Sequence, residues 1–147
     1  ENLLKSKGLD HLVTVDNPLD INPGADDEAH LLTTRFLAED TAVDAVVVGL
    51  DPLSPAMRTL EECEQGRYAF NTPGCIAAAF PELTAQLDKP VVGVVDGGRL
   101  YDPLADTLMQ KGVAVFRSSD RAVNALAMYI EGRLRAARLR SSASAEA

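Results

Sequence analysis

The sequence is poor in the residues from which metal and disulfide sites are built. Its 147 residues include no Trp, two His and only two Cys, Cys63 and Cys75. Because neither Cys belongs to a CxxC pair, the spacing predicts no zinc site. Isolated Cys residues, with no signal-peptide pattern after Glu1, are typical of a reduced cytoplasmic protein. No apolar run reaches the roughly 18 residues that a membrane-spanning helix needs, so we expect no membrane partner.

Several nucleotide-binding signatures are also missing. Neither GxGxxG nor GxxxxGK(S/T) occurs, so a self-contained nucleotide site is not predicted. A flavin-binding flavodoxin is disfavoured, because the first predicted strand lacks a Ser/Thr-Gly phosphate loop and aromatic residues make up only 5%. A receiver domain would need two adjacent acids there and a Lys after a late strand, whereas the chain has Asp16-Asn17 and Lys89 precedes its strand. We therefore expect no cofactor to be bound by this chain alone.

Charge is abundant but unevenly distributed. The net charge of −8 argues against a nucleic acid partner. Before Arg117 the chain has eight Lys or Arg and 19 acids, whereas from Arg117 onward it has six Arg and three acids. The body is therefore acidic and the last predicted helix is basic. That helix either has a solvated basic face or docks on an acidic neighbour. A homodimer also stays open.

Two apolar, β-branched runs, 43–50 and 91–95, indicate the fold class. Such strands are covered on both faces, as in a parallel sheet between helices. Strands and helices are predicted to alternate along the chain. The predicted strands are 11–15, 43–50, 91–95 and 113–116. The predicted helices are 1–8, 26–39, 55–64, 75–87 with a kink or break at Pro81, 101–111 closed by Gly112, and 119–139 beginning near Ser118 or Ser119.

This alternation predicts an α/β fold with right-handed crossovers. Specifically, it predicts a three-layer, flavodoxin-like, doubly wound parallel sheet of about four to five strands. A single domain is expected over residues 1–140, with a frayed tail over residues 141–147.

In open α/β sheets, ligands bind beyond the carboxyl ends of the strands. Asp96-Gly97-Gly98 is the most suggestive strand end, because two glycines allow close approach of a ligand or a neighbouring chain and a helix begins just beyond. A plain tight turn is the alternative. Asp16, Asp51 and Asp96 each follow a predicted strand, so they either bind magnesium together or cap their own turns. The receiver-type pattern is incomplete, so no metal ligand is predicted.

Nucleophiles and bases are scarce. His11 opens a predicted strand and His30 lies among Leu residues on a predicted helix, which favours structural or surface roles for both. Cys75 follows Pro-Gly at a helix N-terminus, where a thiolate is favoured, but no His or Asn partner is apparent. No catalytic residue is predicted.

Five short segments occur together in a recognisable order. They are Asn17-Pro-Leu-Asp20, Val43-Asp-Ala-Val-Val-Val48, Lys89-Pro-Val-Val92, Gly112-Val-Ala-Val-Phe116 and Arg121-Ala-Val-Asn-Ala-Leu126. In order and spacing the chain resembles the C-terminal flavodoxin-like ligase domain of NDP-forming acyl-CoA synthetases, relatives of succinyl-CoA synthetase. The resemblance covers roughly residues 12–134.

The resemblance implies a part in a multidomain enzyme that joins an acid to CoA with ATP or GTP and magnesium. That reaction yields acyl-CoA, a nucleoside diphosphate and phosphate, through an acyl phosphate and a phosphohistidine carried on another domain. Sister CoA-binding and ATP-grasp domains would be the partners, and the family's Gly-rich phosphate segment would lie upstream of this sequence. The chain alone is therefore expected to be inactive.

The expected binding or domain-interface residues come from two sources. The resemblance implies that Asn17, Pro18 and Asp20 order a loop beside a partner domain. Asp96, Gly97 and Gly98 come from the strand-end argument above. The alternative is a stand-alone flavodoxin-like interaction or regulatory module, and a small-molecule enzyme using the Asp residues is the weakest reading.

Overall fold

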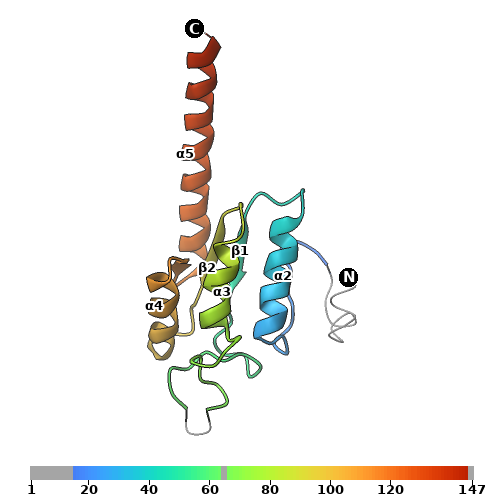
Figure 1. Ribbon diagram of the computed structural model, residues 1–147, viewed down its shortest axis with the longest axis vertical. Helices are drawn as coiled ribbons and strands as arrows, with labels where there is room; N and C mark the ends of the chain where they lie inside the picture. Colours follow the sequence, from blue (N-terminus) through green and yellow to red (C-terminus); the bar gives the residue numbers. More distant parts are fainter. Residues whose placement is uncertain (1–14, 64–65, 146–147) are drawn as a thin grey trace.

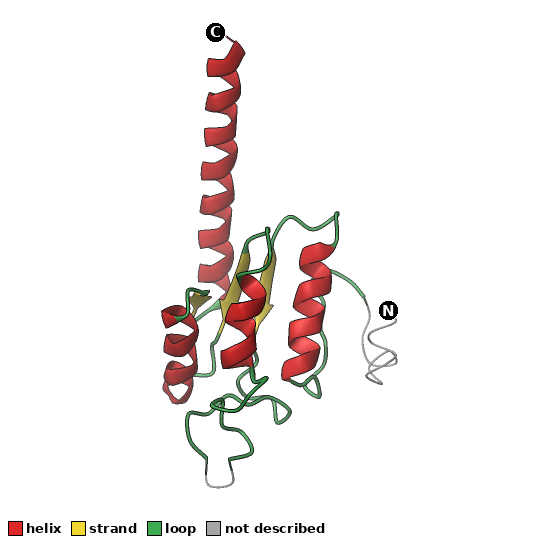
Figure 2. Cartoon of the chain, in the orientation of Figure 1, coloured by secondary structure: helices red, strands yellow, loops and turns green. Residues whose placement is uncertain are grey.

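The computed structural model describes residues 15–63 and 66–145, and these form an α/β fold around a parallel sheet (Figures 1 and 2). The strands are β1 (Val46–Gly49), β2 (Val91–Val94) and β3 (Ala114–Phe116), in the order β1-β2-β3. All pairs are parallel, with Val46 opposite Val91 and Val92 opposite Ala114. The α/β class and the parallel sheet are thus confirmed.

The strand number differs from the prediction. The described part of the chain has three strands rather than four to five. The predicted strand 11–15 lies almost entirely outside the described residues, and Val15, which is described, belongs to no strand. The predicted helix 1–8 lies outside them as well.

Helices cover both faces of the sheet, which gives the three predicted layers. On one face lie α2 (Asp27–Glu39), α3 (Ile76–Thr84) and α4 (Asp102–Gln110), and on the other lies α5 (Ser119–Ala145) (Figure 1). Alternate strand residues divide the core accordingly. Val48 of β1 packs in one cluster with Phe80 and Leu104, whereas Val92 of β2 packs in a second cluster with Ala122.

Of the kink or break predicted at Pro81, the break does not occur, because helix α3 continues across this residue. A proline cannot donate to the carbonyl four residues earlier, here that of Ala77. The Lys111 Nζ donates to that carbonyl oxygen at 2.8 Å and satisfies it. Lys111 is itself held at the end of α4, where Gly112 has a φ of +89° and closes the helix as predicted.

The predicted helix 55–64 is wrong, because local side-chain bonds hold that segment in turns. The Asp51 Oδ1 accepts from the Leu53 N–H at 3.1 Å, and the Thr59 hydroxyl donates to the Pro52 carbonyl at 2.9 Å. Such bonds compete with the helical ladder. A single parallel bridge, between Leu60 and Ala69, follows. The segment is therefore part of one long loop between β1 and α3.

Helix α5 is longer than predicted. It continues to Ala145 rather than ending near residue 139, and its outer part extends well beyond the sheet (Figure 1). None of the helices in the described part of the chain combines the length and apolar character that crossing a membrane requires.

Candidate functional site

The carboxyl ends of the strands lead into turns that pack against each other. A Cβ atom placed on Gly97 would lie 2.7 Å from the Pro52 Cγ and 2.7 Å from the Tyr101 Cδ2. Only glycine fits at that distance, so the turn after β2 lies directly on the turn after β1. Gly98 has a φ of +88°, which also favours glycine, and its N–H donates to the Asp96 carbonyl oxygen. Gly97 and Gly98 therefore build the edge of the sheet.

The three aspartates at the predicted strand ends each close their own turn. Asp16 Oδ1 accepts from the Asn17 N–H at 2.7 Å, Asp51 Oδ1 from the Leu53 N–H at 3.1 Å, and Asp96 Oδ1 from the Gly97 N–H at 2.9 Å. These are the local bonds expected of Asp in turns. Among the described residues, no three His, Cys, Asp or Glu side chains gather as metal ligands. The geometry thus favours turn capping over shared magnesium binding.

Arg117 joins the end of β3 to the same edge; it directly follows the predicted strand 113–116 but is not among the predicted site residues. Its Nη2 donates to the Gly98 carbonyl at 2.6 Å and lies 2.7 Å from the Asp102 Oδ1. One guanidinium therefore ties the turn after β2 to the start of α4. The available signal was its position directly after a predicted strand, where a side chain reaches neighbouring strand ends.

The segment containing Asn17, Pro18 and Asp20 leads to this edge but does not form it. All three residues are exposed, and Asp20 Oδ1 accepts from the Asn22 N–H at 2.9 Å. The turn that follows is bound to the β1 exit, because the Ser54 hydroxyl donates to the Pro23 carbonyl at 2.7 Å. In the part of the chain that the structure describes, no hydrogen bond or ion pair joins Asn17 or Asp20 to the Asp96–Gly98 turn.

A buried carboxylate fixes the long loop, and the sequence reasoning missed it. Asp27 is only 3% exposed; its Oδ2 accepts from the Arg58 Nε at 2.9 Å and its Oδ1 from the Ile76 N–H at 2.7 Å. Arg58 also donates to the Thr72 hydroxyl oxygen at 2.9 Å. From the sequence alone, Asp27 is one of the acids that a helix N-terminus favours. Instead it links α2, the loop and the first turn of α3.

Cys75 and His30 have structural roles. Cys75 is fully buried, and its Sγ lies 2.6 Å from the Phe70 carbonyl oxygen, so a reactive role is disfavoured. His30 is buried on α2, with its Nδ1 3.0 Å from the Asp26 carbonyl oxygen. His11 lies outside the described residues.

Two large apolar side chains are exposed where these turns meet solvent. Leu53, in the turn after β1, is 69% exposed, and Leu100, in the short helix η1 (Arg99–Tyr101), is 66% exposed. The turns that carry them touch through Gly97 and Pro52. A pair of exposed leucines on a firmly tied edge suits contact with another protein domain.

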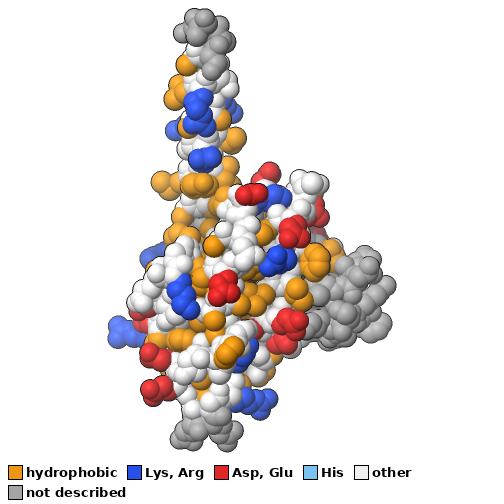
Figure 3. Space-filling view, viewed as in Figure 1, with side chains coloured by type: hydrophobic (Ala, Val, Ile, Leu, Met, Phe, Trp, Pro, Cys, Tyr) orange, Lys and Arg blue, Asp and Glu red, His pale blue; other side chains and the backbone are white. Residues whose placement is uncertain are grey.

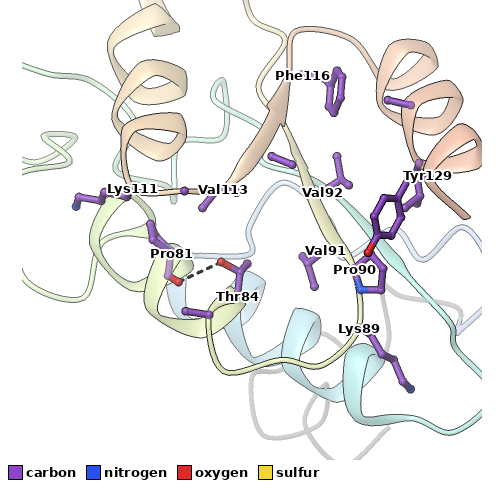
Figure 4. A pocket seen from close by; sticks show the side chains of 15 residues that line it. Pro81, Thr84, Lys89, Pro90, Val91, Val92, Lys111, Val113, Phe116 and Tyr129 are labelled. Carbon is purple, nitrogen blue, oxygen red and sulfur yellow. Dashed lines mark hydrogen bonds between the residues drawn. The ribbon is translucent and has the colours of Figure 1, made fainter. Parts of the chain in front are cut away.

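A hollow lies at the opposite, amino end of the sheet. It encloses about 490 Å³ between α3, the first residues of β2 and β3, and the middle of α5 (Figure 4). Tyr129 reaches from α5 toward Pro90, and the lining is mainly apolar (Figure 4). Lys89 and Lys111 lie at its rim, but their Nζ atoms donate to the carbonyls of Asp40 and Ala77. The hollow is an apolar groove rather than an anion site.

No family model, no curated protein and no solved structure matches the chain. A functional assignment therefore rests on the fold and on the geometry described above.

Proposed function

We propose that this chain is the flavodoxin-like ligase-type domain of an NDP-forming acyl-CoA synthetase, where it packs against sister CoA-binding and ATP-grasp domains. The parent enzyme would join an acid to CoA with ATP or GTP and magnesium, in the cytoplasm. Acyl phosphate and phosphohistidine chemistry would take place on the other domains. This chain's part is to supply a shaped surface.

The proposal rests on two exposed leucines at the carboxyl edge of the sheet, which is the end where the turns after β1, β2 and β3 lie. Leu53 and Leu100 are 69% and 66% exposed, on turns whose backbones are held by Gly97, Asp96 and Arg117. A preformed apolar surface loses little conformational entropy when a partner covers it. Ligands of open α/β sheets also bind at this edge, so a partner domain seated there would complete a site.

The segments that carry the resemblance have roles in the fold that support it. Lys89 of the "KPVV" segment holds the C-terminal carbonyl of α2, at Asp40. Gly112 closes α4 before β3, and Ala122 of α5 packs against Val92 and Val94 of β2. These are requirements of one framework, which is why a family sharing the fold would keep them in the same order and spacing.

Recombination with the sister domains tests the proposal. The reading frames around the coding segment are searched for CoA-binding and ATP-grasp domains, which are then expressed and mixed with this chain. With acid, CoA, ATP or GTP and magnesium, acyl-CoA should form only when all parts are present. Replacing Leu53 and Leu100 by Asp together should lower the rate at least about tenfold, because an interface loses its apolar anchors.

Leu139→Asp is the matched control, because Leu139 is 72% exposed on α5, away from the carboxyl edge. It should leave the rate unchanged. Full activity without this chain, or tight ATP binding by this chain alone in a calorimetric titration, would contradict the proposal. An absence of sister domains around the coding segment would favour a stand-alone interaction module, for which the projecting part of α5 is the supporting observation.

A further inference from the structure

The outer part of α5, residues 131–145, has little protein around it (Figure 1). All side chains described there are exposed except Ala136, which is half-buried, and Leu134 and Leu139 are 53% and 72% exposed. An isolated helix of this length is marginal in water, and Gly132 in its interior weakens it further. A partner that packs along this segment would account for its helical state.

The projecting segment is basic and carries an apolar stripe. Arg133, Arg135, Arg138 and Arg140 stand against one acid, Glu131, which pairs with Arg135 at 3.3 Å. Figure 3 shows basic side chains along the projecting helix, whereas the body below it carries both acidic and basic side chains. Ile130, Leu134 and Ala137 follow at i, i+4 and i+7, so they share one face of the helix.

Three acids stand at the amino edge of the sheet, beside Lys89 and Lys111, whose Nζ atoms are already bonded to the carbonyls of Asp40 and Ala77. Asp40 ends α2, Asp44 precedes β1 and Asp88 precedes β2, and all three residues are exposed. They lie at the end of α2 and at the starts of β1 and β2, and the apolar groove that Pro90 and Tyr129 line is at the same end of the sheet. Because α5 points away from its own body, its tip cannot reach these acids in the same copy (Figure 1).

A second copy of the chain fits both features through a two-fold axis. With the two Leu134 side chains at the axis and the helices antiparallel, Arg138 of one copy is level with Ile130 of the other. Arg140 is then level with Met128, at the partner's amino edge. Residues 131–145 span about 22 Å at about 1.5 Å per residue, which allows this overlap. The contact is self-complementary, as a two-fold dimer requires.

We propose that the chain forms a homodimer in which the two α5 helices pack antiparallel through Ile130, Leu134 and Ala137. The arginine-bearing tip of each helix lies on the acidic amino edge of the other copy. This dimer does not depend on the proposed ligase role, which concerns the carboxyl edge.

Sedimentation of the purified chain over a range of concentrations tests the dimer. The chain should sediment as a dimer that weakens as salt is raised. Leu134→Glu should raise the dissociation constant at least about tenfold, because two charges then meet at the axis. Leu139→Glu is the matched control, since Leu139 lies about 140° around the helix from Leu134 and is more exposed. It should leave the dimer intact.

A charge exchange tests which surfaces meet. The R138E/R140E variant and the D44K/D88K variant should each associate weakly alone, because like charges then face each other across both contacts. An equal mixture should form a heterodimer. The acidic tip of the R138E/R140E copy then faces the basic edge of the D44K/D88K copy, and the basic tip of the D44K/D88K copy faces the acidic edge of the R138E/R140E copy. E61K/E62K reverses two exposed acids in the long loop and should dimerise like the parent chain. A monomeric parent chain at all concentrations, or a mixture that stays monomeric, would overturn the proposal.

Discussion

The two ends of the sheet are built in different ways. At the carboxyl edge, polar bonds of Arg117 and Asp27 tie the segments together, and Gly97 lies directly against neighbouring side-chain rings. At the amino edge, the lining of the groove is mainly apolar and α5 projects past it into solvent. The first arrangement fixes a surface before any partner arrives, whereas the second leaves apolar and charged groups that a partner must cover.

The difference also separates stability from association. Bonds at the carboxyl edge join segments far apart in the sequence, so changes there should mainly affect unfolding. The outer part of α5 contributes little to the two core clusters, so changes there should mainly affect assembly. Substitutions at single residues can therefore test the comparison, beginning with the residue whose loss should cost most.

Asp27→Ala should be the most destabilising change at the carboxyl edge. It would leave Arg58 without its carboxylate partner and the first N–H of α3 without an acceptor, inside a site where Asp27 is 3% exposed. Because the Arg58 side chain is 29% exposed, losing this charged hydrogen-bond partner should cost about 1.5–3 kcal/mol, and the unpaired Ile76 N–H adds to the loss. Urea unfolding followed by circular dichroism measures the loss.

Asp106→Ala provides its control, because Asp106 is an exposed acid on α4. It should change the unfolding free energy by less than about 0.5 kcal/mol. Equal effects of the two substitutions would mean that the Asp27 bonds do not hold the long loop.

Gly97→Ala should cause the next largest loss of stability. The added Cβ would lie 2.7 Å from both Pro52 and Tyr101, so one of the two turns must move. Overpacking of this kind costs about 1–3 kcal/mol. Gly49→Ala is the matched control, because a Cβ there meets nothing within 4 Å and its φ is not positive. If both variants unfold at the same urea concentration, the turns are not in close contact.

Lys111→Met probes the amino edge. The substitution keeps a long side chain but leaves the Ala77 carbonyl without the donor that replaces the one lost at Pro81. We expect a loss of about 1 kcal/mol in thermal or urea unfolding. Gln110→Met, an exposed neighbour at the end of α4, should have no measurable effect. A neutral Lys111→Met would indicate that water satisfies this carbonyl equally well.

These contacts explain which parts of the fold could be predicted from the sequence. The parallel sheet, helix 26–39 and the Gly112 cap follow from apolar periodicity and local capping, which are visible along the chain. The helix predicted over 55–64 failed because Ser54 and Thr59 bond to backbone groups outside helical spacing.

The carboxyl edge was only partly predictable for a different reason. Asp96, Gly97 and Gly98 could be placed at a strand end, but the contact of Gly97 with Pro52 depends on how two strands lie side by side. The partners of Asp27 are 31 and 49 residues away in the sequence, and no local sequence pattern predicts a hydrogen bond over that separation. The turn residues of this edge, Gly97 among them, were therefore predictable, whereas the long-range bonds of Asp27 were not.

The smallest expected effect concerns the start of α5. This helix begins at the carboxyl edge of the sheet and ends beyond the amino edge, so it connects the two regions that are compared. A hydrogen bond from the Ser118 hydroxyl, with help from the Arg121 backbone N–H, lowers the pKa of Asp120 below its usual 3.8. A lowered carboxyl pKa adds stability above the unfolded-state pKa, and this contribution is lost as the pH falls through the folded-state value. Asp120→Asn should thus be slightly less stable than the parent chain at neutral pH, and the difference should disappear in acid below pH 3.8. Its dimer affinity should be unchanged, since Asp120 lies at the opposite end of α5 from the tip; a weaker dimer would show that the two edges are not independent.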